Sequence, residues 1–272
     1  MALPLPTSLS PSKVSAFKDC ALAFRFSAID RLPEPPSVPA VKGTLVHRAL
    51  ELLFCADAPD RTIALGHDCL RRAIDELSAD PEFVELDLDD AARQAFFDDA
   101  ALMVDRYFVV EDPTTINPIG LELRLEAEVG DLRLRGIIDR LELDEDGELV
   151  VTDYKTGRVP HHTQEINRLG GVHFYAFLCE QLFGKRPARV RLLYLGDQPQ
   201  LIIATPSEQS IRGLRKKVSA IWTAVERACE REDFRPKPSR LCDWCAFQAY
   251  CPEFGGDPSA VPMAEQAVAL ST

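Results

Sequence analysis

The sequence has no long hydrophobic run and no apolar leader. No stretch approaches the ~20 consecutive apolar residues of a membrane span. The start, MALPLPTSLSPSKVSAF, lacks the charged residues followed by an apolar segment that mark a signal peptide. We therefore expect a cytoplasmic location and no membrane partner. Because that compartment is reducing, the 8 cysteines indicate metal binding in preference to disulfides.

Positive charge is also scarce. Lys and Arg number 31 against 43 Asp and Glu, and the net charge of −12 argues against a protein coated in nucleic acid. Acidic residues concentrate between Asp80 and Asp99, however, and three basic clusters can line a local phosphate track. A solvated helix face is the competing interpretation for each cluster. The clusters are Arg186/Arg189/Arg191, Arg212/Arg215/Lys216/Lys217 and Arg235/Lys237/Arg240.

Hydrophobic periodicity predicts an α/β protein whose first part is helical. The chain of 272 residues, 46% of them hydrophobic, can fill one large core or two small ones. Helices are expected over 10–29, from Gly43 onward, and over 60–110, 165–183 and 211–229, with an extended or looped proline-rich connection at 31–39. Strands are expected from Leu121 and over 132–143, 148–153, 188–196 and 200–205. Four cysteines in apolar helical patterns are predicted core residues: Cys55, Cys69, Cys179 and Cys229.

The most informative segment is GIIDRLELDEDGELVVTDYKTG, residues 136–157. A turn centred on Asp146 places Asp139 opposite Asp153 in an antiparallel hairpin. Lys155 lies on the same face as Asp153, because strand residues two apart share a face. Two carboxylates can bind Mg²⁺ or Mn²⁺, and the lysine can orient an attacking water and stabilise phosphate charge. The bland alternative is an exposed Asp–Lys pair on a strand edge.

These residues resemble a known family. The order GTLVHRALE (Gly43–Glu51), GIIDRLE, VTDYKTG and FYAFL (Phe174–Leu178) looks like the RecB-like exonucleases of the PD-(D/E)XK nuclease superfamily and is similar to CRISPR-associated iron–sulfur nucleases. The resemblance implies a nuclease core with a central mixed sheet flanked by helices, an N-terminal helical portion and a C-terminal iron–sulfur segment. It also implies site residues: His47, Asp139 and Asp153 as ligands of Mg²⁺ or Mn²⁺, Lys155 as the catalytic lysine, and Tyr175 as a catalytic residue near the DNA.

One position departs from that family. A glutamine usually lies four residues before the helix tyrosine, and this chain has Gly171 there; Gln164 lies too far along the chain to be its equivalent. The departure affects how substrate or water is held. It keeps open the alternative of a nuclease-inactive module that binds DNA ends.

The C-terminal part carries a cysteine cluster. The segment LCDWCAFQAYCPEF places Cys242, Cys245 and Cys251 in a C-x2-C-x5-C array, and Cys20 is a distant fourth candidate. In the resembling nucleases such an array holds a [4Fe-4S] cluster. Zinc also takes four thiolates, so a zinc-stapled adaptor protein remains an alternative. The three-plus-one spacing favours iron–sulfur, as do the neighbouring aromatic residues that can shield inorganic sulfur, Trp244, Phe247 and Tyr250.

The expected function, taken from the resemblance, is hydrolysis of phosphodiesters in DNA. We expect an exonuclease on single-stranded DNA or DNA ends, serving repair or recombination. The chain has no G-x-x-x-x-G-K-[ST] loop, so a helicase partner would be a separate chain. The expected organisation is a helical portion with His47 (1–115), a nuclease core (116–230), a cysteine segment joined to Cys20 (231–254) and a flexible tail (255–272).

Overall fold

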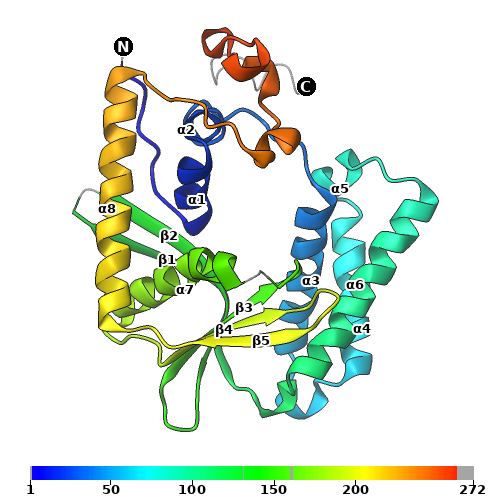
Figure 1. Cartoon of the computed structure of the whole chain (residues 1–272). Helices are drawn as coiled ribbons and strands as arrows, with labels where there is room; N and C mark the ends of the chain where they lie inside the picture. The colour runs from blue at the N-terminus through cyan, green and yellow to red at the C-terminus, as the bar shows by residue number, and fades with distance from the viewer. Residues whose placement is uncertain (1, 131, 160–161, 262–272) are drawn as a thin grey trace. The chain divides into compact units, whose positions relative to one another are not determined.

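The computed structural model describes residues 2–130, 132–159 and 162–261 (Figure 1). Its chain divides into two compact units. Unit 1 comprises Met1–Pro35, Glu126–Arg135 and Arg212–Thr272, and unit 2 comprises Pro36–Leu125 and Gly136–Ile211. The class is α/β, as predicted, with one five-stranded mixed sheet and flanking helices.

Unit 1 begins with a helix that breaks where one continuous helix was expected. Ser10 accepts a hydrogen bond from the Lys13 amide, and Pro11 starts the helix as predicted. At Cys20 the backbone is extended, with φ −157 and ψ 113, so the segment over 10–29 forms three pieces. These are α1 (Pro11–Asp19), α2 (Ala21–Phe24) and the π-helical turn η1 (Arg25–Ile29). The break places Cys20 at the junction of α1 and α2, where its thiol can contact another segment of the chain.

The rest of unit 1 comes mainly from the C-terminal part of the chain. The long helix α8 (Glu208–Arg231) starts just before the boundary of the unit, and four 3-10 turns follow it. The turns are η4 (Arg240–Trp244), η5 (Gln248–Tyr250), η6 (Pro252–Phe254) and η7 (Pro258–Ala260). Of the predicted flexible tail, residues 262–272 lie outside the described residues.

Unit 2 holds a helical layer built on α3 (Val38–Phe54). This helix begins before the predicted Gly43, because Ser37 caps it and Pro39 falls in the first turn, where no amide hydrogen is needed. The expectation that residues 38–39 are extended or looped is therefore wrong. Its apolar face packs with the two other long helices of this layer in one core that includes Leu45, Leu53 and Val104. The remaining helical elements are η2 (Ala58–Asp60), α4 (Ile63–Leu77), α5 (Pro81–Glu85), α6 (Asp90–Val110) and η3 (Pro113–Thr115).

The sheet has the strand order β1-β2-β3-β4-β5. Its strands are β1 (Pro118–Val129), β2 (Leu132–Leu143), β3 (Leu149–Lys155), β4 (Arg189–Tyr194) and β5 (Gln200–Ala204). The pair β2–β3 is antiparallel with Arg140 opposite Thr152, which confirms the register expected from the turn. Strand β4 is parallel to β3, and α7 (His162–Phe183) connects the two. Figure 1 shows β3, β4 and β5 side by side.

Three of the four predicted core thiols are buried: Cys69, Cys179 and Cys229. The prediction for Cys55 is wrong. This residue is the C-cap of α3, where the helix ends and its side chain is exposed. Among the described residues, no helix combines the length and the apolar character that a membrane crossing needs.

One face of the sheet in unit 2 carries a buried ionic network. Arg140, 0% exposed, donates to Glu111 at 2.7 and 2.9 Å and to Glu142 at 2.7 Å. Arg191 on β4 also pairs with both acids, at 2.6 and 3.2 Å. Buried charges are tolerated only when they are paired. The network therefore ties β2 and β4 to Glu111, the residue that follows α6, and Arg140 also donates to Thr152 on β3 at 3.2 Å.

We expect Arg140→Met to lower the free energy of unfolding by about 3–5 kcal/mol, because it leaves buried carboxylates short of a partner. Urea denaturation measures the loss. The matched control is Arg189→Ala. It removes an arginine of β4 that is 46% exposed and paired with Asp144, the residue after β2. That control should cost below about 1 kcal/mol. Equal small losses in both variants would contradict the importance of the network.

Candidate active site

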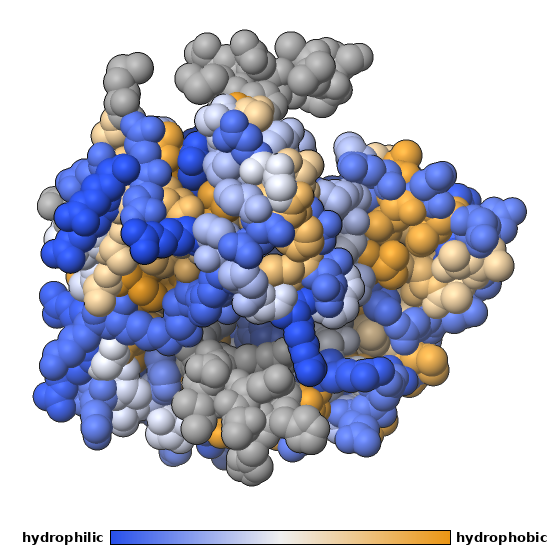
Figure 2. Space-filling model, turned by 45° about the horizontal axis from the view of Figure 1, so that its top comes forward, coloured by the Kyte–Doolittle hydropathy of each residue, from blue (hydrophilic) through white to orange (hydrophobic). Residues whose placement is uncertain are grey.

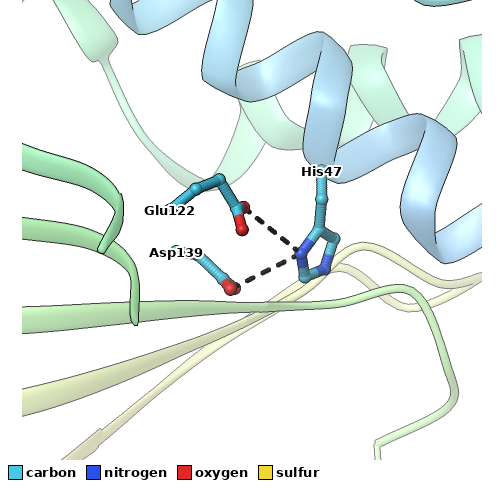
Figure 3. A group of neighbouring side chains, drawn as sticks. All are labelled: His47, Glu122 and Asp139. Atoms are coloured by element: carbon cyan, nitrogen blue, oxygen red, sulfur yellow. Dashed lines mark ion pairs between the residues drawn. The ribbon is translucent and has the colours of Figure 1, made fainter. Parts of the chain in front are cut away.

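Three side chains from three elements of unit 2 converge beside the sheet (Figure 3). His47 comes from α3, Glu122 from β1 and Asp139 from β2. The His47 Nδ1 atom lies 3.5 Å from Asp139 Oδ1 and 4.0 Å from Glu122 Oε1. One ligand atom of each residue lies within 4.8 Å of those of the other two. The arrangement offers one nitrogen and two carboxylate oxygens to a single point.

The peptide groups of Tyr154 orient two of these side chains. Its amide donates to Asp139 Oδ2 at 2.6 Å, and its carbonyl oxygen lies 3.1 Å from His47 Nε2. In the neutral imidazole this contact places the hydrogen on Nε2, which leaves the Nδ1 lone pair directed at the carboxylates. The contacts thus fix both the tautomer of His47 and the free oxygen of Asp139.

Asp153 and Lys155 complete the cluster from β3. Asp153 is 3% exposed, and its Oδ2 forms an ion pair with the Lys155 ammonium. The hydroxyl of Tyr175 on α7 donates to Asp153 Oδ1 at 3.3 Å. The structure therefore brings together all five residues that the sequence singled out at this centre, since Asp139 and Asp153 follow the register of the β2–β3 hairpin.

Two glycines allow the helices to approach the sheet closely. A β-carbon at Gly43 on α3 would lie 3.3 Å from the Thr156 hydroxyl, directly after β3. A β-carbon at Gly136 on β2 would lie 2.9 Å from Leu178 and 3.4 Å from the Tyr175 ring. These short separations position His47 and Tyr175 against the strands that carry the carboxylates.

Glu122 was missed by sequence reasoning. Its strand alternates apolar and polar residues, so Glu122 reads as an ordinary solvent-facing position. In the structure its φ is 43, a left-handed conformation that is rare outside glycine and breaks the regular pleat. The irregularity accompanies a side chain aimed at His47. The one signal available in the sequence was an acidic residue in the strand that precedes the hairpin.

Negative charge is crowded at this centre. Burial, together with the Asp139 charge, raises the pKa of Glu122 to about 7. Burial also raises the pKa of Asp153, and the nearby Asp139 adds to it, against the opposing effect of Lys155. Burial lowers the pKa of His47, but the hydrogen bond and charge of Asp139 outweigh it, so the pKa is raised. A cation at the point of convergence would relieve this crowding.

The donor set fits a hard divalent cation. Carboxylate oxygens are the ligands preferred by Mg²⁺ and Mn²⁺, and an imidazole nitrogen is compatible with Mn²⁺. His47, Glu122 and Asp139 present such atoms, and Asp153 lies beside them on the next strand. The second-sphere contacts from the Tyr154 peptide are those expected around a metal-binding histidine and carboxylate.

On α7, the family glutamine position is occupied by Gly171. A β-carbon added there would meet nothing within 4 Å, so the place is open. Gln164 belongs to the stretch 162–170, whose side chains lie outside the described residues. The described part of α7 therefore supplies Tyr175 but no amide side chain at position 171.

A second group of candidate ligands lies within unit 1. Its four cysteines line one cavity of about 270 Å³: Cys20, Cys242, Cys245 and Cys251. Burial raises the pKa of the Cys245 thiol, and the other three thiols raise it further. Among the described residues, only the His47 group brings three ligand atoms within 4.8 Å of one another, so no three of these sulfurs are that close. Phe247 is buried against Phe26, whereas Trp244, which also lines the cavity, is 79% exposed.

A family model described as the PD-(D/E)XK nuclease superfamily matches residues 8–252. The chain belongs to the PD-(D/E)XK nuclease superfamily. Membership supports a hydrolytic nuclease that uses a divalent metal and has DNA as its substrate. The centre at His47, Glu122 and Asp139 is the place among the described residues where such a metal fits.

Two solved structures align with most of the chain, and one of them reaches a TM-score above 0.5. A crystal structure of a candidate exonuclease from Eubacterium rectale aligns with a TM-score of 0.53 at 11% identity, over 88% of this chain and 87% of that one. The structure of SSO0001 aligns with a TM-score of 0.38 at 16% identity, over 86% and 92%. At such identities the first likeness shows the fold alone. No protein with a curated function matches the chain by sequence.

Metal binding at this PD-(D/E)XK centre should strengthen as pH rises from about 6 to about 8, because protons and metal compete for the same atoms. Glu122, with a pKa of about 7, and His47, with a raised pKa, must lose their protons to act as ligands. Calorimetric titration with Mn²⁺ should show an affinity gain of about tenfold per pH unit for each displaced proton. Glu122→Gln should bind more weakly with a shallower pH dependence. Affinity independent of pH would exclude these two residues as ligands.

Proposed function

We propose that the chain is a RecB-like exonuclease that degrades single-stranded DNA or DNA from its ends. The observation that carries the proposal is the convergence of His47, Glu122 and Asp139 with the Asp153–Lys155 pair. The alternative, an exposed Asp–Lys pair without a catalytic role, does not account for Asp153, which is 3% exposed and lies among other carboxylates. The name of the Eubacterium rectale protein supports the exonuclease class.

In this proposal, His47, Glu122, Asp139 and Asp153 hold Mg²⁺ or Mn²⁺. The cation, when bound, supplies charge neutralisation at the scissile phosphate and favours deprotonation of the attacking water. Lys155 orients that water and stabilises phosphate charge through its ammonium. The ammonium is available because the charge of Asp153 raises its pKa, although burial alone would lower it. Tyr175 fixes the orientation of Asp153 through the hydroxyl contact.

We also propose a cellular setting for this chemistry. Degradation of strands from DNA ends belongs to repair and recombination, and we place the chain in the cytoplasm. A nuclease without its own ATP-driven motor acts on ends that are exposed by another protein. We therefore propose a helicase on a separate chain as the supplier of unwound strands.

Gly171 favours a second candidate, a nuclease-inactive module that binds DNA ends. The position lacks the amide that the family uses near the tyrosine, although the surrounding space would accept a side chain. The two candidates differ in whether DNA is hydrolysed once it is bound. A single-turnover assay with Mg²⁺ or Mn²⁺ on end-labelled single and double strands separates them.

Asp153→Ala and Lys155→Ala should each reduce the single-turnover cleavage rate by about 10²- to 10⁴-fold, because each removes a group at the reacting phosphate or water. Asp153→Ala should also weaken Mn²⁺ binding, whereas Lys155→Ala should leave it intact. Circular dichroism checks the fold. The matched control is Lys185→Ala, an exposed lysine paired with Glu148. Wild-type rates in Asp153→Ala would refute the assignment of the centre.

We further propose that the four cysteines of unit 1 bind a [4Fe-4S] cluster. Tetrahedral zinc holds its sulfurs about 3.8 Å apart, since each Zn–S bond is about 2.3 Å long. A [4Fe-4S] cluster is larger and also takes four cysteine ligands, and here four cysteines line one cavity. The Ser239 amide lies 3.4 Å from Cys242 Sγ, a backbone contact typical of cluster sulfurs. The cluster joins α1 and α2 to the C-terminal segment and acts as a structural staple.

Anaerobically purified protein should be brown and contain about four irons and four sulfides per chain. Cys20→Ser should lose the colour and lower the midpoint of thermal unfolding, because the ligand that joins the distant segment is gone. Cys229→Ser, which changes a buried thiol outside the cavity, serves as the control for cysteine loss in the same unit. Colourless, active protein with one tightly bound zinc would overturn the cluster.

A further inference from the structure

Three lysines from distant parts of the sequence lie together in unit 1. Lys18 is at the end of α1, Lys217 is on α8, and Lys237 follows α8. The Lys237 ammonium donates to the Lys18 carbonyl oxygen at 2.8 Å. The Lys217 ammonium lies close enough to that of Lys18 for the two positive charges to repel each other. All three side chains are exposed, so two of the basic clusters noticed in the sequence meet at α1.

Three acids, Asp19, Glu34 and Glu253, line the same cavity as Lys237, but none of the ion pairs among the described residues joins them to these lysines. None of the three lysines forms an ion pair with a carboxylate there, whereas Arg235, close by in sequence, pairs with Asp233 at 3.0 Å. Burial and the charge of Lys18 lower the pKa of Lys217. Like charges held close together are unfavourable until a counterion arrives. The group is therefore arranged to receive an anion.

Other basic groups lie near the start of α1. Lys13 lies near Arg135 and Arg31, whose charges add to burial in lowering its pKa. Lys13 lies five residues before Lys18, about 140° away around α1, so the two side chains leave the helix on different sides. Hydrophilic residues dominate the side of the molecule where α8 lies in Figure 2. Three ammonium groups from three segments fit a polyphosphate backbone better than a single small anion.

Exposed aromatic residues adjoin the lysines. Lys237 lines the cysteine cavity together with Trp244 and Phe254. Trp244 is 79% exposed and Phe254 51% exposed. An exposed indole is unfavourable in water but provides a stacking surface for an unpaired base. Duplex DNA keeps its bases stacked inside, so this combination of aromatic and basic groups favours a single strand.

We propose that Lys18, Lys217 and Lys237 bind the phosphate backbone of a DNA single strand, one of whose bases stacks on Trp244. The inference rests on the proposed nuclease function and names the substrate-binding surface of unit 1. This surface uses residues separate from the carboxylate centre of unit 2. It binds DNA whether or not a metal is present.

The test measures fluorescence anisotropy of labelled oligothymidine of about 20 nucleotides in EDTA, where no cleavage occurs. The holoprotein and a Lys18→Ala/Lys217→Ala/Lys237→Ala triple variant are compared over a range of salt concentrations. We expect at least about a tenfold loss of affinity and a decrease of about 2 in the salt slope, since each phosphate contact in single strands contributes about 0.7. Thermal unfolding and iron content should not change, because the replaced side chains are exposed.

Single variants give a matched comparison on one helix. Lys217→Ala should lower the salt slope by about 0.7, and Lys216→Ala, its exposed neighbour, should not. Trp244→Ala should weaken single-strand binding more than duplex binding. Wild-type affinity in the triple variant would overturn the proposal. A triple variant that lost heparin or RNA binding but kept its affinity for DNA would also overturn the proposal. If Trp244→Ala weakened single-strand and duplex binding equally, the single-strand assignment would be wrong.

Failure of this inference is distinguishable from failure of the nuclease proposal. If the wild-type chain cleaves DNA but the triple variant binds normally, only the lysine surface is refuted. If the wild-type chain binds through the lysines but never cleaves with Mg²⁺ or Mn²⁺, only the nuclease proposal fails.

Discussion

The candidate active site depends on one peptide segment, the end of β3 around Tyr154. The amide of this residue holds Asp139, and its carbonyl oxygen holds His47. Strand alternation sends the Tyr154 side chain to the other face, where its hydroxyl accepts a hydrogen bond from Arg140 at 3.0 Å. The same alternation leaves Asp153 and Lys155 on the face of the carboxylates. A small rotation of this strand would therefore disturb the histidine, both aspartates and the lysine together.

Two layers of buried charge lie on opposite faces of β2 and β3, and they differ in how they are balanced. Around Arg140, two arginines offset two glutamates, and the network is closed by ion pairs. On the other face, Glu122, Asp139 and Asp153 face Lys155 and His47, and the pKa values of Glu122 and Asp153 stay raised. The first layer is complete within the chain and stabilises it. In the second layer the carboxylates are incompletely neutralised by positive charge, and this is the condition for binding a cation.

The sequence predicted the parts of this site that follow from local rules. Hairpin register and strand alternation placed Asp139, Asp153 and Lys155, because both depend only on spacing along the chain. Glu122 escaped prediction, because its backbone conformation departs from the pleat that alternation assumes. The break at Cys20 escaped for a similar reason, since the flanking residues all suit a helix. The contact between Lys18 and Lys237 could not be predicted, because it depends on tertiary packing between distant segments. Composition and periodicity describe only local structure.

A net charge of −12 is compatible with a DNA-binding surface, because charge acts locally in salt. The screening length at physiological ionic strength is about 8 Å, so a phosphate responds chiefly to the groups that surround it. The acidic stretch from Asp80 to Asp99 belongs to unit 2, whereas Lys18, Lys217 and Lys237 belong to unit 1. A DNA strand bound by these lysines is stabilised by their local positive charge. The negative charge of the rest of the protein disfavours DNA binding elsewhere. Scarcity of basic residues then restricts where DNA binds, and does not prevent it from binding.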